Sequence, residues 1–237
     1  MIKGISMAAR AMKNQVVRND VIANNLANVN TVAFKKDVPA FQLEESGGGI
    51  ETRVLVAVSH AQGPLTRTDR PLDVAIEGDG YFVVETDEGE AYTRRGSFIR
   101  DEDGYVITSE GHRVVSSGGA LQIGTGDISI SREGIIEVDG DEIGRLRIVR
   151  FEDKTGLIKT GSSLFTPAGG EVPEDLTEEE VSVLSGFIEE SNVEVVSEMT
   201  KMIKALKAYE IAQKALKAQD EVLQLTVGKV GSTSGSS

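Results

Sequence analysis

The sequence predicts an α+β protein, with long N- and C-terminal helices pairing as a coiled coil and a central antiparallel all-β domain. Three observations lead to this fold class. Apolar residues step by three and four at both ends of the chain, short runs in the middle alternate apolar and polar residues, and glycine-bearing turns separate those runs. The chain has 237 residues, enough for one large domain or two small ones.

The N-terminal pattern predicts a helix over about residues 3–29. Its members alternate steps of four and three, which is the spacing of a heptad seam. Gly4, at the very start, is the only residue in the stretch that disfavours a helix. The seam consists of Ile5, Ala9, Met12, Val16, Asn19, Ala23 and Leu26.

The C-terminal pattern predicts a second helix that ends near Val227, before Gly228. Ser191 and Glu194 have the spacing of a capping box. At about 1.5 Å per residue the helix is roughly 50 Å long. An alanine-rich flank beside its seam stays exposed unless another subunit covers it, which indicates assembly. The seam consists of Val195, Met199, Met202, Leu206, Tyr209, Gln213 and Leu216.

The middle of the chain contains short candidate strands, Tyr81 to Val84 among them, separated by turn signals such as Asp103-Gly104 and Asp139-Gly140. Glycine-rich stretches at 46–49 and 166–170 are expected flexible breaks. We therefore expect a terminal helical assembly domain (1–34 plus 191–230), a connecting segment (35–70 plus 171–190), a β domain (71–170) and a disordered tail (231–237).

Charge is unevenly distributed along the chain. Residues 1–36 carry six basic and one acidic side chain, whereas residues 37–192 carry 13 basic and 32 acidic ones. So acidic a centre argues against nucleic acid as a partner, because phosphate contacts need clustered Lys and Arg. Lys3, Arg10 and Lys13 interrupt the N-terminus, so we expect no cleavable signal peptide.

Patterns that suggest chemistry have simpler interpretations as turns. Asp101-Glu102-Asp103-Gly104 lacks the late bidentate Glu of a calcium loop, because His112 stands at that position. Glu77 and Asp79 flank Gly78 next to a predicted turn. The sequence contains no phosphate loop, nucleotide fingerprint or nucleophile elbow. We therefore predict no catalytic, cofactor-binding or metal-binding residue, no small-molecule substrate, and a protein that is not an enzyme.

Three sequence blocks resemble the flagellar rod, hook and hook-basal-body proteins. The first runs from Asp20 to Thr31 and continues with Phe34-Lys35-Lys36. The second contains Arg70-Pro71-Leu72-Asp73-Val74-Ala75 and is followed by Tyr92-Thr93-Arg94-Arg95-Gly96. The third runs from Ser185 through Glu189 and Asn192 to Met199. The second block is similar to the rod proteins FlgF and FlgG.

The resemblance implies a structural subunit of the bacterial flagellar basal-body rod that self-assembles through its terminal helices. It implies as partners other copies, other rod and hook-basal-body proteins and the flagellar type III export apparatus, and a place in the periplasm-spanning rod. The short stretch 42–62 favours the proximal-rod (FlgF) type, and the third block is equally similar to the distal-rod (FlgG) type. Ala33 departs from the family pattern, which commonly has Gly there and so permits a positive φ.

The predicted assembly interface combines both seams with a group of asparagines. The asparagines either end the first helix or hydrogen-bond across subunits and fix their register. We also expect the terminal helices of a free monomer to stay largely unfolded until they dock. The competing interpretation is a β-domain adhesin on a coiled-coil stalk. The predicted interface residues are Ile5, Met12, Val16, Asn24, Asn25, Leu26, Asn28, Val195, Met199, Met202, Leu206, Tyr209 and Leu216.

Overall fold

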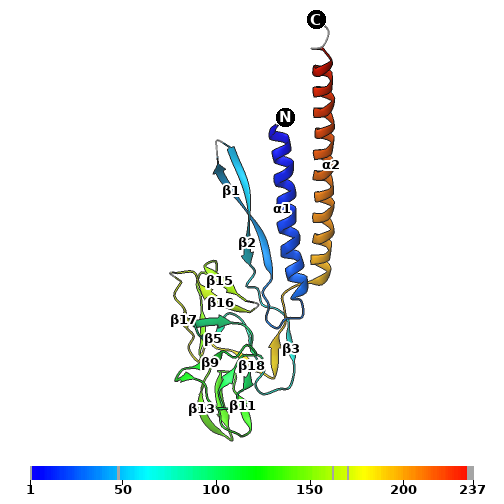
Figure 1. The fold of residues 1–237 in the computed structure, drawn as a ribbon. Helices are drawn as coiled ribbons and strands as arrows, with labels where there is room; N and C mark the ends of the chain where they lie inside the picture. The colour runs from blue at the N-terminus through cyan, green and yellow to red at the C-terminus, as the bar shows by residue number, and fades with distance from the viewer. Residues whose placement is uncertain (1, 47–48, 162, 170, 234–237) are drawn as a thin grey trace. The chain divides into compact units, whose positions relative to one another are not determined.

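A computed structural model describes residues 2–46, 49–161, 163–169 and 171–233, with the side chains of 2–5, 43–46, 49–53, 220 and 223–233 left out of the description. The chain forms two compact units (Figure 1). The helical unit comprises Met1–Ala27, Asp37–Ala57 and Glu194–Ser237. The β unit comprises Asn28–Lys36 and Val58–Val193. Each unit is therefore assembled from segments that are far apart in the sequence.

The helical unit contains two helices and a β-hairpin. Helix α1 spans Ile2–Ala27 and helix α2 spans Val195–Thr233. Strands β1 (Asp37–Ser46) and β2 (Gly49–Val58) form a two-stranded sheet. Helix α2 continues past Gly228, where it was predicted to stop. Residues 234–237 of the predicted tail lie outside the described residues.

The coiled-coil pairing predicted for the two helices is wrong. A coiled coil buries its seam positions, yet Val16, Met199 and Leu206 are 45%, 53% and 49% exposed. The residues that α2 buries instead include Glu198 and Ala205, which lie on a neighbouring line of the helix. The predicted seam falls between this buried line and a second, exposed apolar line. The steps of three and four in the predicted seam therefore combine residues of a buried face with residues of an exposed face.

The β unit consists of short strands in antiparallel pairs. The central path of its largest sheet runs β15-β16-β6-β5-β9-β8-β7, with β14 also paired to β5. A three-stranded meander, β11-β12-β13, and two small pairs, β18-β4 and β19-β3, complete the unit. The strands are β3 Leu65–Arg67, β4 Val74–Ile76, β5 Tyr81–Thr86, β6 Gly89–Thr93, β7 Ile99–Arg100, β8 Val106–Ile107, β9 Arg113–Ser116, β10 Gly119–Ala120, β11 Ile128–Ile130, β12 Ile135–Val138, β13 Asp141–Arg145, β14 Ile148–Arg150, β15 Leu157–Thr160, β16 Leu164–Pro167, β17 Glu174–Asp175, β18 Val183–Ser185 and β19 Phe187–Glu189.

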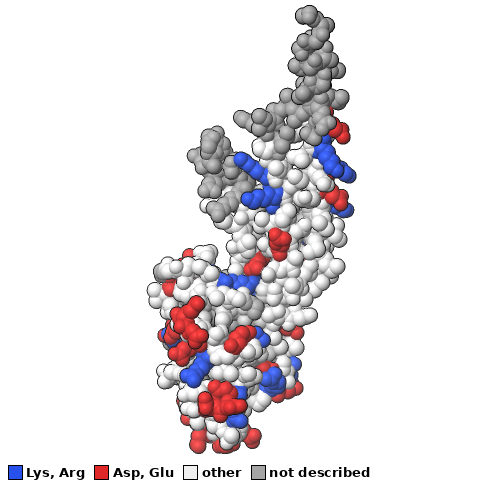
Figure 2. Space-filling view, in the orientation of Figure 1, with Lys and Arg blue, Asp and Glu red and all other residues white. Residues whose placement is uncertain are grey.

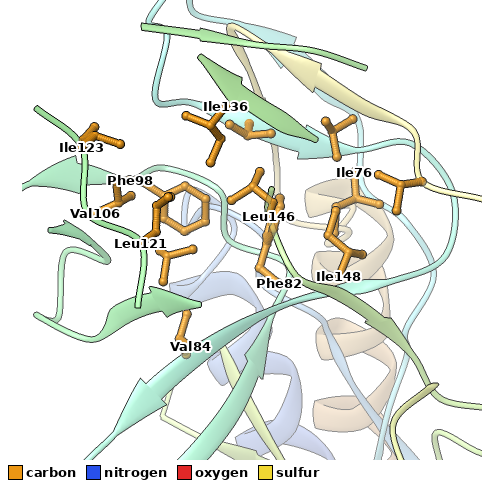
Figure 3. Close-up of a cluster of buried hydrophobic side chains, with 14 of the residues drawn as sticks. Ile76, Phe82, Val84, Phe98, Val106, Leu121, Ile123, Ile136, Leu146 and Ile148 are labelled. Atoms are coloured by element: carbon orange, nitrogen blue, oxygen red, sulfur yellow. The ribbon is translucent and has the colours of Figure 1, made fainter. Parts of the chain in front are cut away.

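Strand β5 is buried on both of its faces, because alternate side chains of a strand point in opposite directions. Phe82 and Val84 enter the larger core, which Figure 3 shows in close-up. Tyr81 and Val83 enter a second core together with Phe165. Each fully buried side chain of this size contributes about 1.5–3 kcal/mol to stability. The two cores therefore make β5 the centre of the unit.

The turn between β12 and β13 confirms the predicted Asp139-Gly140 signal. Val138 pairs with Asp141, which leaves a two-residue loop. Asp139 and Gly140 have φ values of 54° and 90°, as a type I′ hairpin turn requires. The predicted break at 166–170 is wrong at its start, because Thr166 lies inside β16. Gly47 and Gly48, in the other predicted break, lie outside the described residues.

The stretch expected to connect the domains contains regular structure. Strands β1, β2 and β3 all lie within residues 35–70. None of these strands was predicted from the sequence. The period-two pattern of β1 is weak, because Pro39 and Ala40 interrupt the β-branched and aromatic residues that usually mark a strand.

Candidate assembly surface

Helix α2 begins close to its predicted position but with a different cap. Ser191 Oγ accepts a hydrogen bond from the Val193 amide at 3.3 Å, and the helix begins only at Val195. The predicted capping box of Ser191 and Glu194 is therefore wrong. The Glu198 amide donates to the carbonyl oxygen of Glu194 at 3.0 Å, so Glu194 is the residue that precedes the first turn.

Two apolar lines run along the first turns of α2. The inner line contains Ala205, which is buried, and Met202, Tyr209 and Leu216, which are half-buried. The outer line is solvent-exposed, and we call it the α2 stripe. Its residues recur at steps of three and four, so they share one face. The stripe consists of Val195, Val196, Met199, Ile203 and Leu206, with exposed fractions between 42% and 73%.

The hairpin of the helical unit carries a second exposed apolar group, which we call the hairpin patch. Phe41 and Val56 are 53% and 52% exposed, and Val38 and Leu55 are 40% and 39% exposed. Leu55 and Val56 are neighbours in β2, so the patch occupies both faces of the hairpin. The guanidinium of Arg18 lies over the Phe41 ring, 5.5 Å from its centroid. An isolated two-stranded hairpin is only marginally stable in water. The patch therefore favours a covering partner.

The predicted interface residues have diverse environments. Val16, Asn24, Val195, Met199 and Leu206 are exposed, whereas Asn25 is buried. The side chain of Ile5 lies outside those described. The half-buried members are Met12, Leu26, Asn28, Met202, Tyr209 and Leu216.

Asn25 joins three elements of the helical unit. Its side-chain amide donates to the Asp37 carbonyl oxygen at 2.8 Å, and its Oδ1 accepts from the Asp37 amide at 2.8 Å. The same Nδ2 lies 3.5 Å from Glu198 Oε2. Asn25 thus fixes the first residue of β1 against α1 and the first turns of α2.

Asn28 bonds locally, after the end of α1. Its Oδ1 accepts from Thr31 Oγ1 at 3.2 Å, and its carbonyl oxygen accepts from the Thr31 amide at 3.1 Å. The interpretation of this asparagine as a turn residue after the first helix agrees with these bonds.

A buried cluster of charges lies in the β unit. Glu189, at the end of β19, has no exposed surface, and Lys35 and Arg94 are 1% and 4% exposed. One carboxylate oxygen of Glu189 accepts from Lys35 Nζ at 2.5 Å, and the other accepts from Arg94 Nε at 2.8 Å. Burial lowers the pKa of Lys35, and the Glu189 carboxylate opposes that effect.

The remaining donors of the cluster have backbone acceptors. Arg94 donates to the carbonyl oxygens of Gly78, Gly80 and Ile76, and Lys35 Nζ donates to that of Ala61 at 2.7 Å. Each of the three resembling blocks contributes one member: Lys35, Arg94 and Glu189. Their contact was not predicted from the sequence. Lys35 follows Phe34 and Glu189 follows Ile188, which was the only available signal, whereas Arg94 lies between Thr93 and Arg95.

The stretches that resembled a calcium loop and a carboxylate pair form a turn and surface hydrogen bonds. Asp101 Oδ1 accepts from the Tyr105 amide at 2.7 Å, and Gly104 has a φ of 86°, so this segment is a turn. Glu77 accepts from Arg132 and from Ser182. Across the described side chains, no group of three or more His, Asp or Glu is placed to hold a metal ion. None of the described helical segments is long and apolar enough to cross a membrane.

Comparisons with known proteins assign the chain to a family. Three family profiles match: Flagella basal body rod protein over residues 5–35, Flagellar hook protein FlgE/F/G D1 domain over 75–138, and Flagellar basal body rod FlgEFG protein C-terminal over 184–227. A flagellar basal-body rod protein FlgG of Bacillus subtilis is 33% identical, with 94% of this chain and 97% of that protein covered. The chain belongs to the flagellar basal-body rod protein family.

Relatives within the rod family have two names. FlgF of Caulobacter vibrioides is 31% identical over 90% of this chain and 91% of its own length. FlgF of Mesorhizobium japonicum is 34% identical over 81% of this chain and 83% of its own length. The chain is thus a structural basal-body rod subunit and not an enzyme. The similarity to FlgF and FlgG is nearly equal.

Proposed function

We propose that this rod subunit self-assembles through the α2 stripe and the hairpin patch. The observation that supports the proposal is the second apolar face of α2, which is exposed while the neighbouring face packs within the unit. Exposed apolar residues in a contiguous row mark interaction sites in soluble proteins. Other copies of the subunit and neighbouring basal-body components are the partners.

Rough magnitudes indicate that both surfaces take part. The stripe exposes on the order of 450 Å² of apolar surface, which corresponds to about 11 kcal/mol when it is covered. Association alone costs about 4–15 kcal/mol. The hairpin patch exposes roughly 300 Å² over its two faces, so a contact that covers the stripe and one face of the hairpin buries roughly 600 Å², near the ~800 Å² that each partner buries in a stable interface. Two different patches also favour a head-to-tail contact, which does not close and therefore generates a filament.

Charge insertion into the stripe tests this proposal. Met199→Glu and Ile203→Glu should each abolish sedimentable assemblies of the purified full-length protein, because the carboxylate would have to be desolvated in the contact. Gln219→Glu makes the same charge change at an exposed site on another side of α2 and should assemble like the wild type. Assembly of the Met199 and Ile203 variants at wild-type concentrations would overturn the proposal.

We further propose that the subunit is of the proximal-rod type. Relatives named FlgF and FlgG are almost equally similar to this chain, so overall identity does not separate the two types. The support for the proximal type is the short stretch 42–62. Expression of the chain in strains that lack either FlgF or FlgG tests it. Restored swimming only in the strain without FlgG would show the distal type instead.

We also propose that the subunit is exported through the flagellar type III apparatus without cleavage of its N-terminus. The charges at Lys3, Arg10 and Lys13 support it, because they interrupt the apolar run that a cleavable signal needs. Mass spectrometry of the subunit from isolated basal bodies should find the N-terminal peptide of residues 1–10, with or without Met1. A mature N-terminus further along the chain would contradict export in this form.

A further inference from the structure

Three separate segments lead into or out of the β unit, and they lie together. They are residues 33–36, which follow α1, residues 59–64, which follow the hairpin, and residues 189–192, which precede α2. We call these three segments the junction. All of its residues belong to the β unit.

Backbone hydrogen bonds align the junction segments. The Ala33 amide donates to the Glu189 carbonyl oxygen at 2.7 Å, and the Asn192 amide donates to that of Phe34 at 3.2 Å. On the other side, the Glu190 amide donates to the Pro64 carbonyl oxygen at 2.8 Å. The segment before α2 therefore lies between the other two.

Side chains close the junction at two points. The Glu189 carboxylate accepts from Lys35 in the first segment, and from the Gly63 amide at 2.9 Å in the second. Its second oxygen accepts from Arg94, which is anchored to the turn before β5 through Gly78 and Gly80. One buried carboxylate thus contacts every segment of the junction and the body of the β unit.

Asn192 repeats this arrangement without a charge. Its Oδ1 accepts from the Lys36 amide at 2.7 Å, and its Nδ2 donates to the carbonyl oxygens of Ser59 and Ala61 at 2.9 and 2.8 Å. The Ser59 amide in turn donates to the Lys36 carbonyl oxygen at 2.9 Å.

We propose that Glu189 is a positioning residue which, together with Asn192, fastens the three connecting segments to the β unit as one anchor. The packing leaves little alternative space, because a Cβ at Gly63 would lie 2.1 Å from the Glu190 carbonyl oxygen. A cluster that served stability alone could sit anywhere in the core. This one sits where the chain passes to the helical unit.

In an assembled rod, the anchor would keep these segments from loosening when neighbouring subunits pull on the helical unit. Only this consequence rests on the proposed function. The sedimentation assay of the stripe variants tests the assembly surface, whereas the anchor is tested in the dispersed protein. Failure of one proposal is therefore distinguishable from failure of the other.

Hydrogen exchange of the full-length protein tests the anchor. In Glu189→Gln, the amides of Ala33, Glu190 and Asn192 should exchange at least tenfold faster than in the wild type. Amides of β5 and β6 should change less than twofold. Glu77→Gln, which makes the same chemical change at an exposed ion pair with Arg132, should leave both sets unchanged.

Two further variants separate positioning from stability. Glu189→Gln leaves two buried cations without their anion, so it should also lower the urea midpoint of unfolding. The double variant Lys35→Met/Glu189→Gln removes one cation together with the anion. It should therefore restore the midpoint, while the junction amides still exchange as fast as in Glu189→Gln. Asn192→Ala changes no charge, so it provides the test if Glu189→Gln does not fold, and it should also accelerate the junction amides tenfold. The inference would be overturned by any of three results. Glu189→Gln could accelerate the junction and β5 amides equally, the double variant could restore slow exchange at the junction, or Asn192→Ala could exchange like the wild type.

Discussion

At the scale of single residues, the turn after α1 shows how a substitution can be accommodated. Ala33 is fully buried and has a φ of 56°. A non-glycine residue in this left-handed region carries strain of about 1–2 kcal/mol. The presence of Ala in place of Gly therefore leaves the positive φ unchanged, and the hydrogen bond from the Ala33 amide to the Glu189 carbonyl oxygen maintains it.

Substitution of Ala33 should reveal this strain. Ala33→Val should lower the free energy of unfolding by at least about 2 kcal/mol, because a β-branched side chain is poorly tolerated at positive φ and has no room here. Ala33→Gly should change it by less than about 1 kcal/mol, because relieved strain is offset by greater freedom of the unfolded chain. Urea unfolding of the three proteins measures both, and equal stability of Ala33→Val and wild type would contradict the strain.

His60 should make stability depend on pH. Its Nδ1 lies 2.7 Å from the Tyr81 hydroxyl. Burial, Lys154 and Lys35 lower the pKa of His60 to about 4, against a small opposite effect of Asp79. The folded protein therefore binds fewer protons than the unfolded chain between pH 4 and 6.5. The stability present above pH 6.5 is lost as the pH falls through this window.

The size of this loss is limited by solvent. Because His60 is only half-buried, we expect roughly 1–2 kcal/mol rather than the full linkage value. Urea unfolding at about pH 7 and about pH 4.5, for wild type and His60→Gln, isolates the contribution, because the carboxylates titrate in both proteins. Identical pH profiles of the two proteins would rule out this role of His60.

At the scale of elements, the sequence was informative where an apolar run or a turn pair is complete within a few residues. Tyr81 to Val84 predicted β5, and Asp139-Gly140 predicted the turn after β12, because local chemistry determines both. The seam of α2 could not be placed, since Met202 lies on a buried line and Met199 on an exposed one. Periodicity does not distinguish two apolar faces. The contact between Lys35, Arg94 and Glu189 could not be predicted from local patterns either, because 154 residues separate Lys35 from Glu189.

The two neighbouring asparagines of α1 allow a matched test of element packing. Asn25→Ala should lower the stability of the helical unit by about 2–3 kcal/mol, because it leaves both backbone groups of Asp37 without their side-chain partner. Asn24→Ala, at an exposed position, should cost less than about 0.5 kcal/mol. Thermal melts followed by circular dichroism at 222 nm compare the two. A loss for Asn24→Ala as large as that for Asn25→Ala would contradict the role of Asn25 in this packing.

At the scale of the whole molecule, the two units differ in charge. The β unit carries 14 basic and 28 acidic side chains, whereas the helical unit carries 11 and 10. Figure 2 shows acidic side chains over the β unit on this face. Copies of the β unit therefore repel one another, which agrees with the proposal that association uses apolar surface on the nearly neutral helical unit.

Salt should consequently promote assembly. Raising sodium chloride from about 20 mM to about 500 mM shortens the Debye length to a few ångströms, which screens the repulsion between β units and leaves apolar contacts intact. The concentration needed for sedimentable assemblies should fall several-fold. An increase in that concentration would indicate that ion pairs between subunits dominate the contact. The charge-neutral variant Met199→Ser should assemble poorly at both salt concentrations.

The adjacency of residues 59–64 and 189–192 has a consequence for how such a chain can diversify. The larger segment of the β unit, Val58–Val193, begins and ends at neighbouring points, as a domain inserted into another does. The residues between those points form a cassette, closed by the hydrogen bond from the Glu190 amide to the Pro64 carbonyl oxygen. A larger or smaller module with the same two ends, and with a cation in the place of Arg94, could replace it and leave the helical unit unaltered, so the two units are free to evolve at separate rates.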